Sequence, residues 1–98
     1  DPVQHDLPRL PAGWGDRLIP LPVATASGGQ VVGLCLEAHD LVLSKYVASR
    51  EKDRAFNRAA IRHGLVQRDV LLDRLGAMDV GPALRQVLRG QIEADFAR

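Results

Sequence analysis

The sequence contains little cysteine, few aromatic residues and no long apolar run. Its 98 residues include one cysteine, one tryptophan, one tyrosine and two phenylalanines. A single cysteine excludes an internal disulfide framework and a cysteine-rich zinc site. No stretch approaches the ~20 consecutive apolar residues of a membrane-spanning helix, so we expect no membrane association. We find no signal peptide and expect a cytoplasmic protein.

The composition is typical of a packed polypeptide with balanced charge. Hydrophobic residues make up 46% of the chain and charged residues 26%, and the formal net charge is +1. This composition argues against a disordered or collagen-like chain. The small net charge gives no general reason to expect nucleic-acid or membrane partners. The length allows one domain at most, and the opening Asp-Pro leads us to expect a piece of a larger protein.

Residues 1–16 carry three prolines and two glycines and show no regular period. Proline and glycine at this density predict an irregular arm. Its only aromatic side chain is Trp14, which we expect to pack on the body of the protein rather than to bind a ligand.

Residues 17–36 predict a β-hairpin. Arg17–Val23 contains two prolines, which suit an edge strand because proline has no N–H to donate to a ladder. Val31–Leu36 is apolar and predicts a buried strand, with Cys35 as an inert core thiol. Two strands alone are marginally stable in water. We therefore expect helices, a second copy or further strands of a larger sheet to cover them.

Residues 37–98 show the helical period and predict four helices, at His39–Ala48, Arg50–His63, Arg68–Leu75 and Pro82–Ala97. Glycines follow the second and third, and Gly81 precedes the fourth, where it suits an N-cap before proline. The fold class is α+β, an arm and a hairpin followed by about four helices. Residues expected to face inward are Leu43, Tyr46, Val47, Phe56, Ala59, Ala60, His63, Leu71, Leu72, Leu75, Leu84, Val87, Leu88, Ile92 and Phe96.

The stretch around Ser49 holds the residues most suited to binding a phosphate. Both lysines of the chain, Lys45 and Lys52, lie in it, and a break at Ser49 would put Arg50, Lys52 and Asp53 in the first turn of a helix. Unpaired N–H groups and the positive dipole end make such a turn a ready anion site. Asp53 would then cap the turn, position Lys52 or help hold a metal-bound triphosphate. From patterning alone, a solvated run of charges is the simpler interpretation.

A row of arginines four residues apart forms a second basic feature. Between residues 41 and 68, seven basic residues stand against two acidic ones. The row could follow a nucleic-acid backbone, RNA included, or it could pair with acids on neighbouring helices, and the sequence leaves both readings open. The candidate stripe comprises Arg54, Arg58 and Arg62 after Arg50, and the acids are Asp69, Asp73, Asp79, Glu93 and Asp95.

The histidines give no metal-binding pattern. There is no HExxH and no Cys/His cluster, so we predict no metal site within this chain. His39 and Asp40 open the first helix, where we favour a hydrogen-bonding pair at the cap. They could instead form the rim of a site together with Ser44.

The order of charged residues from Leu36 onward resembles a family of bacterial nucleotidyltransferase-like proteins of unassigned function, related to AbiEii-type toxins of toxin–antitoxin and phage-defence systems. Ala38 replaces the family's proline and Tyr46 its leucine. The preceding GWGDRLIPL is also similar, so the resemblance runs from Gly13 to about Leu75. The matching residues are Leu36, Glu37, His39, Asp40, Ser44, Lys45, Arg50, Glu51, Lys52 and Asp53.

The resemblance implies a nucleotidyltransferase fold of the polymerase-beta type. Lys45 would contact phosphate, Lys52 and Asp53 would complete the nucleotide site, and Arg50 would add a contact. The family's glycine-serine turn and paired strand acids have no match in residues 1–36. Transfer through Mg²⁺ needs such carboxylates, so we expect Mg²⁺ and a nucleoside triphosphate only in the complete enzyme and none for this chain alone.

Two functions follow from these patterns. The first is the C-terminal portion of a nucleotidyltransferase-like protein, inactive alone and partnered by a missing N-terminal half or another chain. The second is a non-catalytic helical module that binds protein or nucleic acid through the arginine stripe. A homodimer is compatible with either function.

Overall fold

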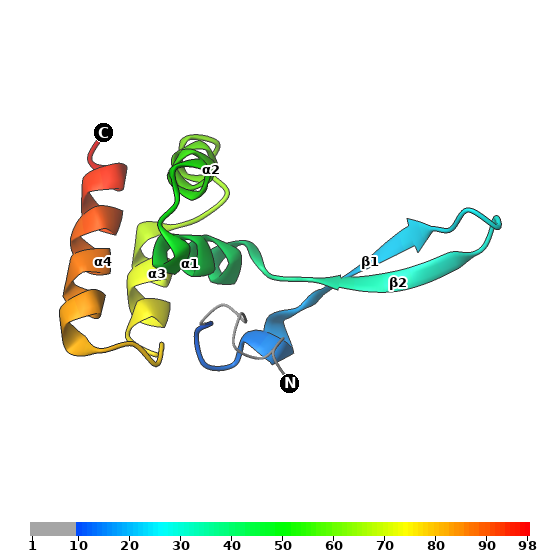
Figure 1. The fold of residues 1–98 in the computed structure, drawn as a ribbon, viewed down its shortest axis with the longest axis horizontal. Helices are drawn as coiled ribbons and strands as arrows, with labels where there is room; N and C mark the ends of the chain where they lie inside the picture. Colours follow the sequence, from blue (N-terminus) through cyan, green and yellow to red (C-terminus); the bar gives the residue numbers. More distant parts are fainter. Residues whose placement is uncertain (1–9) are drawn as a thin grey trace.

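The computed structural model describes residues 10–98 and confirms the α+β class, with a two-stranded hairpin that extends from a group of four helices (Figure 1). A short 3₁₀ helix precedes the hairpin. In chain order the elements are η2 (Trp14–Arg17), β1 (Ile19–Ala24), β2 (Gln30–Cys35), α1 (Ala38–Ala48), α2 (Glu51–Arg62), α3 (Arg68–Leu75) and α4 (Pro82–Phe96).

Local sequence signals set the helix ends. The side chain of Glu37 accepts hydrogen bonds from two backbone N–H groups and caps α1. Ser49 ends α1 with a positive φ of 58°, which confirms the predicted break. Gly64 follows α2 with a φ of 71°, a conformation that glycine adopts without strain. Gly81 and Pro82 begin α4 as predicted, because proline suits the first helical position.

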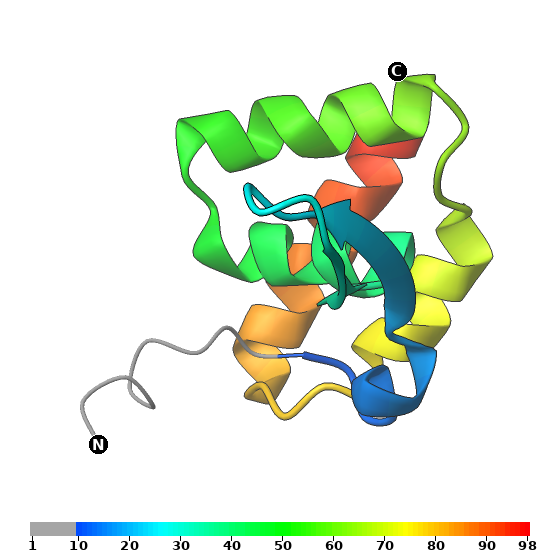
Figure 2. The same cartoon turned by 90° about the vertical axis from the view of Figure 1, so that its right-hand side faces the viewer.

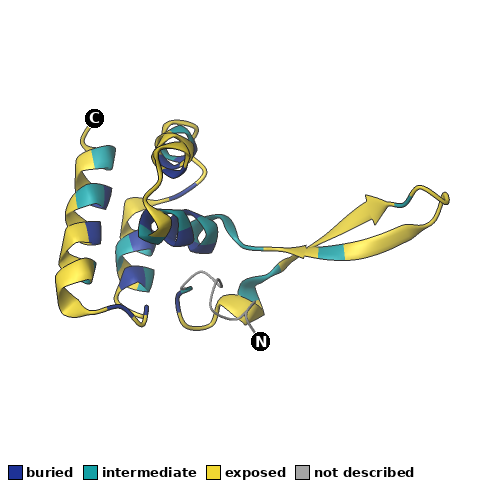
Figure 3. Ribbon diagram, viewed as in Figure 1, coloured by how far each residue is buried: buried dark blue, intermediate teal, exposed yellow. Residues whose placement is uncertain are grey.

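The four helices pack together (Figure 2), and the buried residues of the core lie among them (Figure 3). Helix α1 packs between α2 and α3, and α4 packs against α3 and α2. Burying these side chains removes apolar surface from water, which is the main favourable contribution to folding. The core residues are Val42, Leu43, Tyr46, Ala60, Val66, Leu71, Leu75, Met78, Val80, Leu88 and Ile92.

The hairpin lies outside this core and is exposed along both strands (Figure 3). The prediction that Val31–Leu36 is a buried strand is therefore wrong, and so is the core position of Cys35, which is exposed. The sequence pattern shows that the strand is apolar but not what covers it. Within residues 10–98, the helices bury one another and leave both faces of the hairpin open to solvent. Its exposed large apolar side chains are Ile19, Leu21, Val23, Val31, Val32 and Leu34.

The hairpin register shows which strand edge can accept another strand. The strands are antiparallel, with Pro20 opposite Leu34 and Pro22 opposite Val32. The Thr25 N–H donates to the Gly29 carbonyl, and hydrogen-bonded and non-hydrogen-bonded pairs alternate along such a ladder. Both prolines therefore occupy non-hydrogen-bonded positions and remove two donors from the outer edge of β1. The outer edge of β2 keeps its donors, and no strand within residues 10–98 pairs with it, so we call it the open edge.

Several side chains face differently from the prediction. On α2 and at its C-cap, Phe56 and His63 are exposed, and Asp53 and Asn57 are buried instead. Ala60 is buried as expected. On α4, Leu84 and Val87 are exposed, whereas Leu88 and Ile92 are buried as expected. Trp14 is 41% exposed rather than buried against the body.

The predicted irregular arm is partly helical. Trp14–Arg17 form η2, and the Ala12 N–H donates to the carbonyl of Ala77, which ties this segment to the helical region beyond α3. The rest of the arm prediction, residues 1–9, lies outside the described residues. In the described part of the chain, we find no helix with the length and apolar character needed to cross a membrane.

Candidate functional site

A buried carboxylate holds two cationic side chains at the start of α2. Asp53 is fully buried, and its Oδ2 accepts from the Nε of Arg50 at 2.7 Å and from the Arg50 backbone N–H at 3.2 Å. The Nζ of Lys45, on α1, lies 3.4 Å from Asp53 Oδ1. The tight turn at Ser49 brings the end of α1 beside the start of α2 and so joins the three residues.

This arrangement keeps Asp53 ionised. The hydrogen bond from the Arg50 guanidinium lowers the pKa of Asp53, burial opposes the shift, and Lys45 adds to the lowering. Lys45 also lies over the Phe56 ring, with Nζ 4.8 Å from the ring centroid, a cation–π contact. The Lys45 side chain is 27% exposed, so these contacts leave it partly accessible to solvent. A fixed, partly exposed ammonium is suited to contact a phosphate.

The structure does not bring Lys52 into this group. Lys52 is exposed on α2 and forms no ion pair with any described residue. Asp53 caps α2, which is one of the three roles that the sequence suggested for it. Its ion pairs are with Lys45 and Arg50 and not with Lys52. The simpler interpretation, that these charged residues form a solvated run, is correct for Glu51, Lys52 and Arg54, which are exposed. It is wrong for Asp53, which is buried.

The remaining arginines of the stripe are exposed along α2. Arg54 donates to the Ser49 hydroxyl at 3.3 Å, and Arg58 and Arg62 form no ion pair within residues 10–98. Three of the acids that could have paired with the stripe have other partners. Asp69 and Glu93 pair with Arg68, and Asp95 accepts from the Tyr46 hydroxyl and lies near Arg98.

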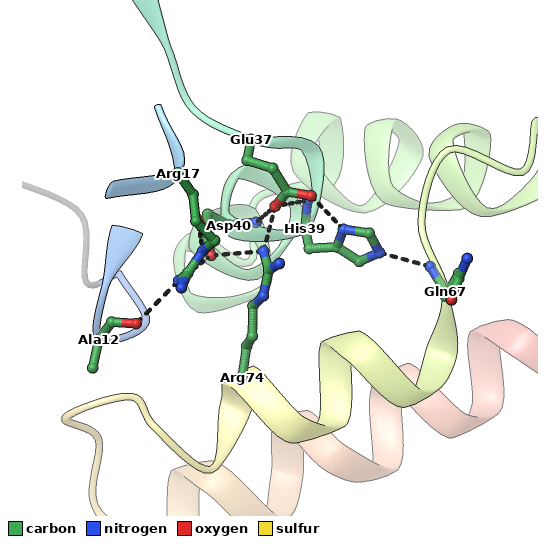
Figure 4. Close-up of polar contacts among 7 residues, drawn as sticks. All are labelled: Ala12, Arg17, Glu37, His39, Asp40, Gln67 and Arg74. Carbon is green, nitrogen blue, oxygen red and sulfur yellow. Dashed lines mark hydrogen bonds and ion pairs between the residues drawn. The ribbon is translucent and has the colours of Figure 1, made fainter. Parts of the chain in front are cut away.

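A second polar cluster joins η2, α1 and α3 (Figure 4). Asp40 is fully buried and accepts from Arg17 through both oxygens, at 2.8 and 2.9 Å. Arg74 on α3 donates to Asp40 at 3.2 Å and also to Glu37. The cluster links elements that are far apart in the sequence.

His39 extends this cluster toward the start of α3. The Gln67 backbone N–H donates to its Nε2 at 2.9 Å, so Nε2 accepts and Nδ1 carries the proton that faces Glu37 at 2.6 Å. Burial disfavours the charged form of Glu37, but hydrogen bonds from His39 and Arg74 outweigh it and lower the pKa of Glu37 to about 2.

The three predicted rim residues are therefore engaged inside the molecule. His39 and Asp40 belong to the cap region as favoured, but each bonds to other partners instead of forming a pair. Ser44 is buried and donates to the Leu41 carbonyl at 2.7 Å. Sequence reasoning missed Arg17, Arg74 and the buried Asn57, because no local spacing connects them to their surroundings.

The described residues offer no ligand set for Mg²⁺. No group of three or more His, Cys, Asp or Glu side chains within residues 10–98 could hold a metal ion. The buried acids Asp40 and Asp53 already accept from arginine or lysine.

Comparison with known proteins identifies the family. No curated protein and no solved structure matches the chain. The profile of one family, described as nucleotidyltransferase of unknown function (DUF6036), matches residues 1–81. This range includes the Lys45–Arg50–Asp53 group and the polar cluster around Asp40. The chain therefore belongs to the DUF6036 family of nucleotidyltransferases.

Proposed function

We propose that this chain supplies the nucleotide-phosphate contacts of a nucleotidyltransferase, with Lys45 and Arg50 as the phosphate-binding cations and Asp53 as the residue that positions them. The observation that supports this proposal most directly is the fully buried Asp53 carboxylate. It forms ion pairs with both Lys45 and Arg50 beside the N-terminus of α2. On this proposal Lys52, which is exposed in the first turn of α2, would add a more distant contact. The reaction of the complete enzyme is transfer of a nucleoside monophosphate from a triphosphate.

The carboxylates for Mg²⁺ would come from outside residues 10–98. The open edge of β2 and the two apolar faces of the hairpin support this part of the proposal, because a sheet inside an α/β protein is apolar on both faces. Strands that add to β2 would extend the sheet from the hairpin. On this proposal the 98 residues bind nucleotide and do not catalyse transfer alone.

The order of charged residues from Leu36 to Asp53 also supports a relation to AbiEii-type toxins. On that relation the acceptor is an RNA end or a protein hydroxyl. Incubating a complete family member with radiolabelled nucleotide and either total RNA or protein would identify the acceptor by the fraction that becomes labelled.

A nucleotide titration followed by NMR tests the phosphate site. The 98-residue chain is titrated with ATP, GTP, CTP and UTP in the presence of Mg²⁺. We expect the largest amide shifts at Lys45 and Arg50–Asp53, because these N–H groups lie closest to the proposed site. Absence of shifts at millimolar nucleotide, or shifts confined to other helices, would overturn the proposal.

Substitutions of Lys45 and Lys52 distinguish a fixed phosphate site from general attraction between the nucleotide and positive charge. Lys45→Met should weaken triphosphate binding by at least tenfold, Lys45→Arg should retain most of it, and Lys52→Met should change it about twofold or less. Thermal unfolding of each variant checks that the fold persists. Equal losses for Lys45→Met and Lys52→Met would indicate general electrostatic attraction and contradict a fixed site.

A second candidate function is nucleic-acid binding through the arginine stripe. The observation that favours it is the exposure of Arg54, Arg58 and Arg62 on one helix, while three acids of α3 and α4 have other partners. A double Arg54→Glu, Arg58→Glu variant should lose RNA binding and the salt dependence that accompanies it. Unchanged RNA affinity would remove this candidate.

A further inference from the structure

Phe56 is the one aromatic side chain of α2, and it lies at the surface. It is 40% exposed and is not one of the core residues. Asp53, three residues earlier, is its neighbour on the helix, because residues three apart lie on the same side. The ring therefore lies beside the group that Asp53 forms with Lys45 and Arg50.

The Lys45 ammonium contacts both the ring and the carboxylate. Its Nζ lies 4.8 Å from the centroid of the Phe56 ring and 3.4 Å from Oδ1 of Asp53. The first distance is well within the ~6 Å of a cation–π contact, whereas the second exceeds the roughly 2.7–3.2 Å of an ordinary hydrogen bond. Arg50 makes the shorter contact with Asp53, at 2.7 Å. The ring is therefore a main contact of this ammonium and not an addition to a tight ion pair.

The ring restrains the ammonium without cancelling its charge. Asp53 supplies one negative charge to two cations, Lys45 and Arg50, so the group keeps a net positive charge. A second carboxylate beside Lys45 would remove that charge and repel a phosphate. An aromatic ring attracts an ammonium through its quadrupole and carries no net charge of its own.

Restraint of Lys45 before binding favours contact with a phosphate. A lysine side chain has a flexible four-carbon stem, and fixing it costs rotamer entropy. Contacts that are already present in the unbound chain remove part of that cost from the binding step. The Lys45 side chain is also 27% exposed, so the ring does not seal it from solvent.

We propose that Phe56 is a positioning residue of the phosphate site, and that its ring holds the Lys45 ammonium in place for the triphosphate. This inference rests on the proposed function, because it takes Lys45 as a phosphate-binding cation. It adds that residue 56 must be aromatic for tight binding, and that apolar bulk alone is not enough.

Calorimetric titration with inorganic tripolyphosphate, without Mg²⁺, tests this role, because that anion has the phosphates of a nucleotide and no base. We expect Phe56→Leu to weaken binding to the 98-residue chain at least threefold. Phe56→Tyr should retain it, since tyrosine also forms cation–π contacts. Val87→Ala, at a 56% exposed position on α4, controls for the loss of an exposed apolar side chain and should have no effect. Unchanged binding in Phe56→Leu, or an equal loss in Phe56→Tyr, overturns the proposal.

A double substitution shows whether Phe56 acts through Lys45. In a Lys45→Met chain, Phe56→Leu should cause no further loss of tripolyphosphate affinity, because the ring then has no ammonium to hold. Thermal unfolding checks that each variant folds. A further loss of threefold or more in the double variant would show that Phe56 acts on another group, and it would overturn the proposal.

Proton NMR of the unbound chain tests the contact without a ligand. The Lys45 ε-methylene protons should resonate upfield of those of Lys52, the other lysine of the chain, because a ring shields protons above its face. The upfield shift should disappear in Phe56→Leu and persist in Phe56→Tyr. Absence of the shift in the unsubstituted chain overturns this inference and leaves the Lys45 phosphate site standing. Absence of tripolyphosphate binding to the unsubstituted chain contradicts the proposed function, and this inference with it.

Discussion

Arg17 and Asp40, which are 23 residues apart in the sequence, form a bidentate ion pair. The Nε of Arg17 lies 2.8 Å from one carboxylate oxygen of Asp40 and the Nη2 lies 2.9 Å from the other. Arg17 stands at the base of the hairpin and Asp40 in the first turn of α1 (Figure 4). The pair therefore fixes where the exposed hairpin leaves the helical region.

Asp40→Asn should destabilise the chain. The substitution leaves Arg17 and Arg74 without their buried anion, and breaking a buried pair costs about 3–5 kcal/mol. Because both arginines are partly exposed and can turn toward water, we expect a loss near 3 kcal/mol. Urea unfolding measures this loss of unfolding free energy. Asp73→Asn, on the exposed face of α3, is the control. A loss below 1 kcal/mol would show that the pair adds little.

Acidification should weaken the fold through Glu37. Its pKa falls from an ordinary value of 4.5 to about 2 in the folded chain, so the folded state favours the charged form. The resulting stability is fully present above about pH 4.5 and is lost as the pH falls toward 2. Glu37→Gln should flatten the decline in unfolding free energy between pH 5 and pH 2, compared with Glu51→Gln. Parallel declines in both variants would contradict the role of Glu37.

The hairpin should mediate association of the isolated chain. Val32 is 68% exposed beside the open edge of β2, and charged residues on strand edges oppose pairing with other strands. We expect concentration-dependent association in sedimentation experiments, and we expect Val32→Lys to reduce it without lowering the unfolding temperature. Val87→Lys, at a 56% exposed position on α4, is the control. If Val32→Lys and Val87→Lys reduce association equally, the chains do not associate through the hairpin specifically.

Cys35 should react with a thiol reagent in the folded chain. It is exposed at the end of β2, and the rate of thiol modification depends on access as well as on the thiolate fraction. We expect Ellman's reagent to modify the native chain at a rate within a few-fold of the urea-unfolded chain. Strong protection in the native chain at low protein concentration would show that the strand is covered.

The sequence alone was enough to predict the order of elements and the ends of the helices. Gly64, Gly81 and Pro82 act through the backbone conformations that they favour, and these depend only on near neighbours. The proximity of Arg50 and Asp53 follows in the same way, since residues three apart meet on a helix. Such short-range features survive in any tertiary arrangement.

Only the tertiary structure decided which faces are buried. The apolar pattern placed β2 in the core and Phe56 inward, yet the four helices cover one another and leave the hairpin exposed. On α2, the contact of Asp53 with Lys45 turns that face toward α1 and carries Asn57, one turn later, into the interior. Arg17, Asp40 and Arg74 meet only because three separate elements pack together. Burial and long-range pairing depend on docking between elements, which local periodicity does not specify.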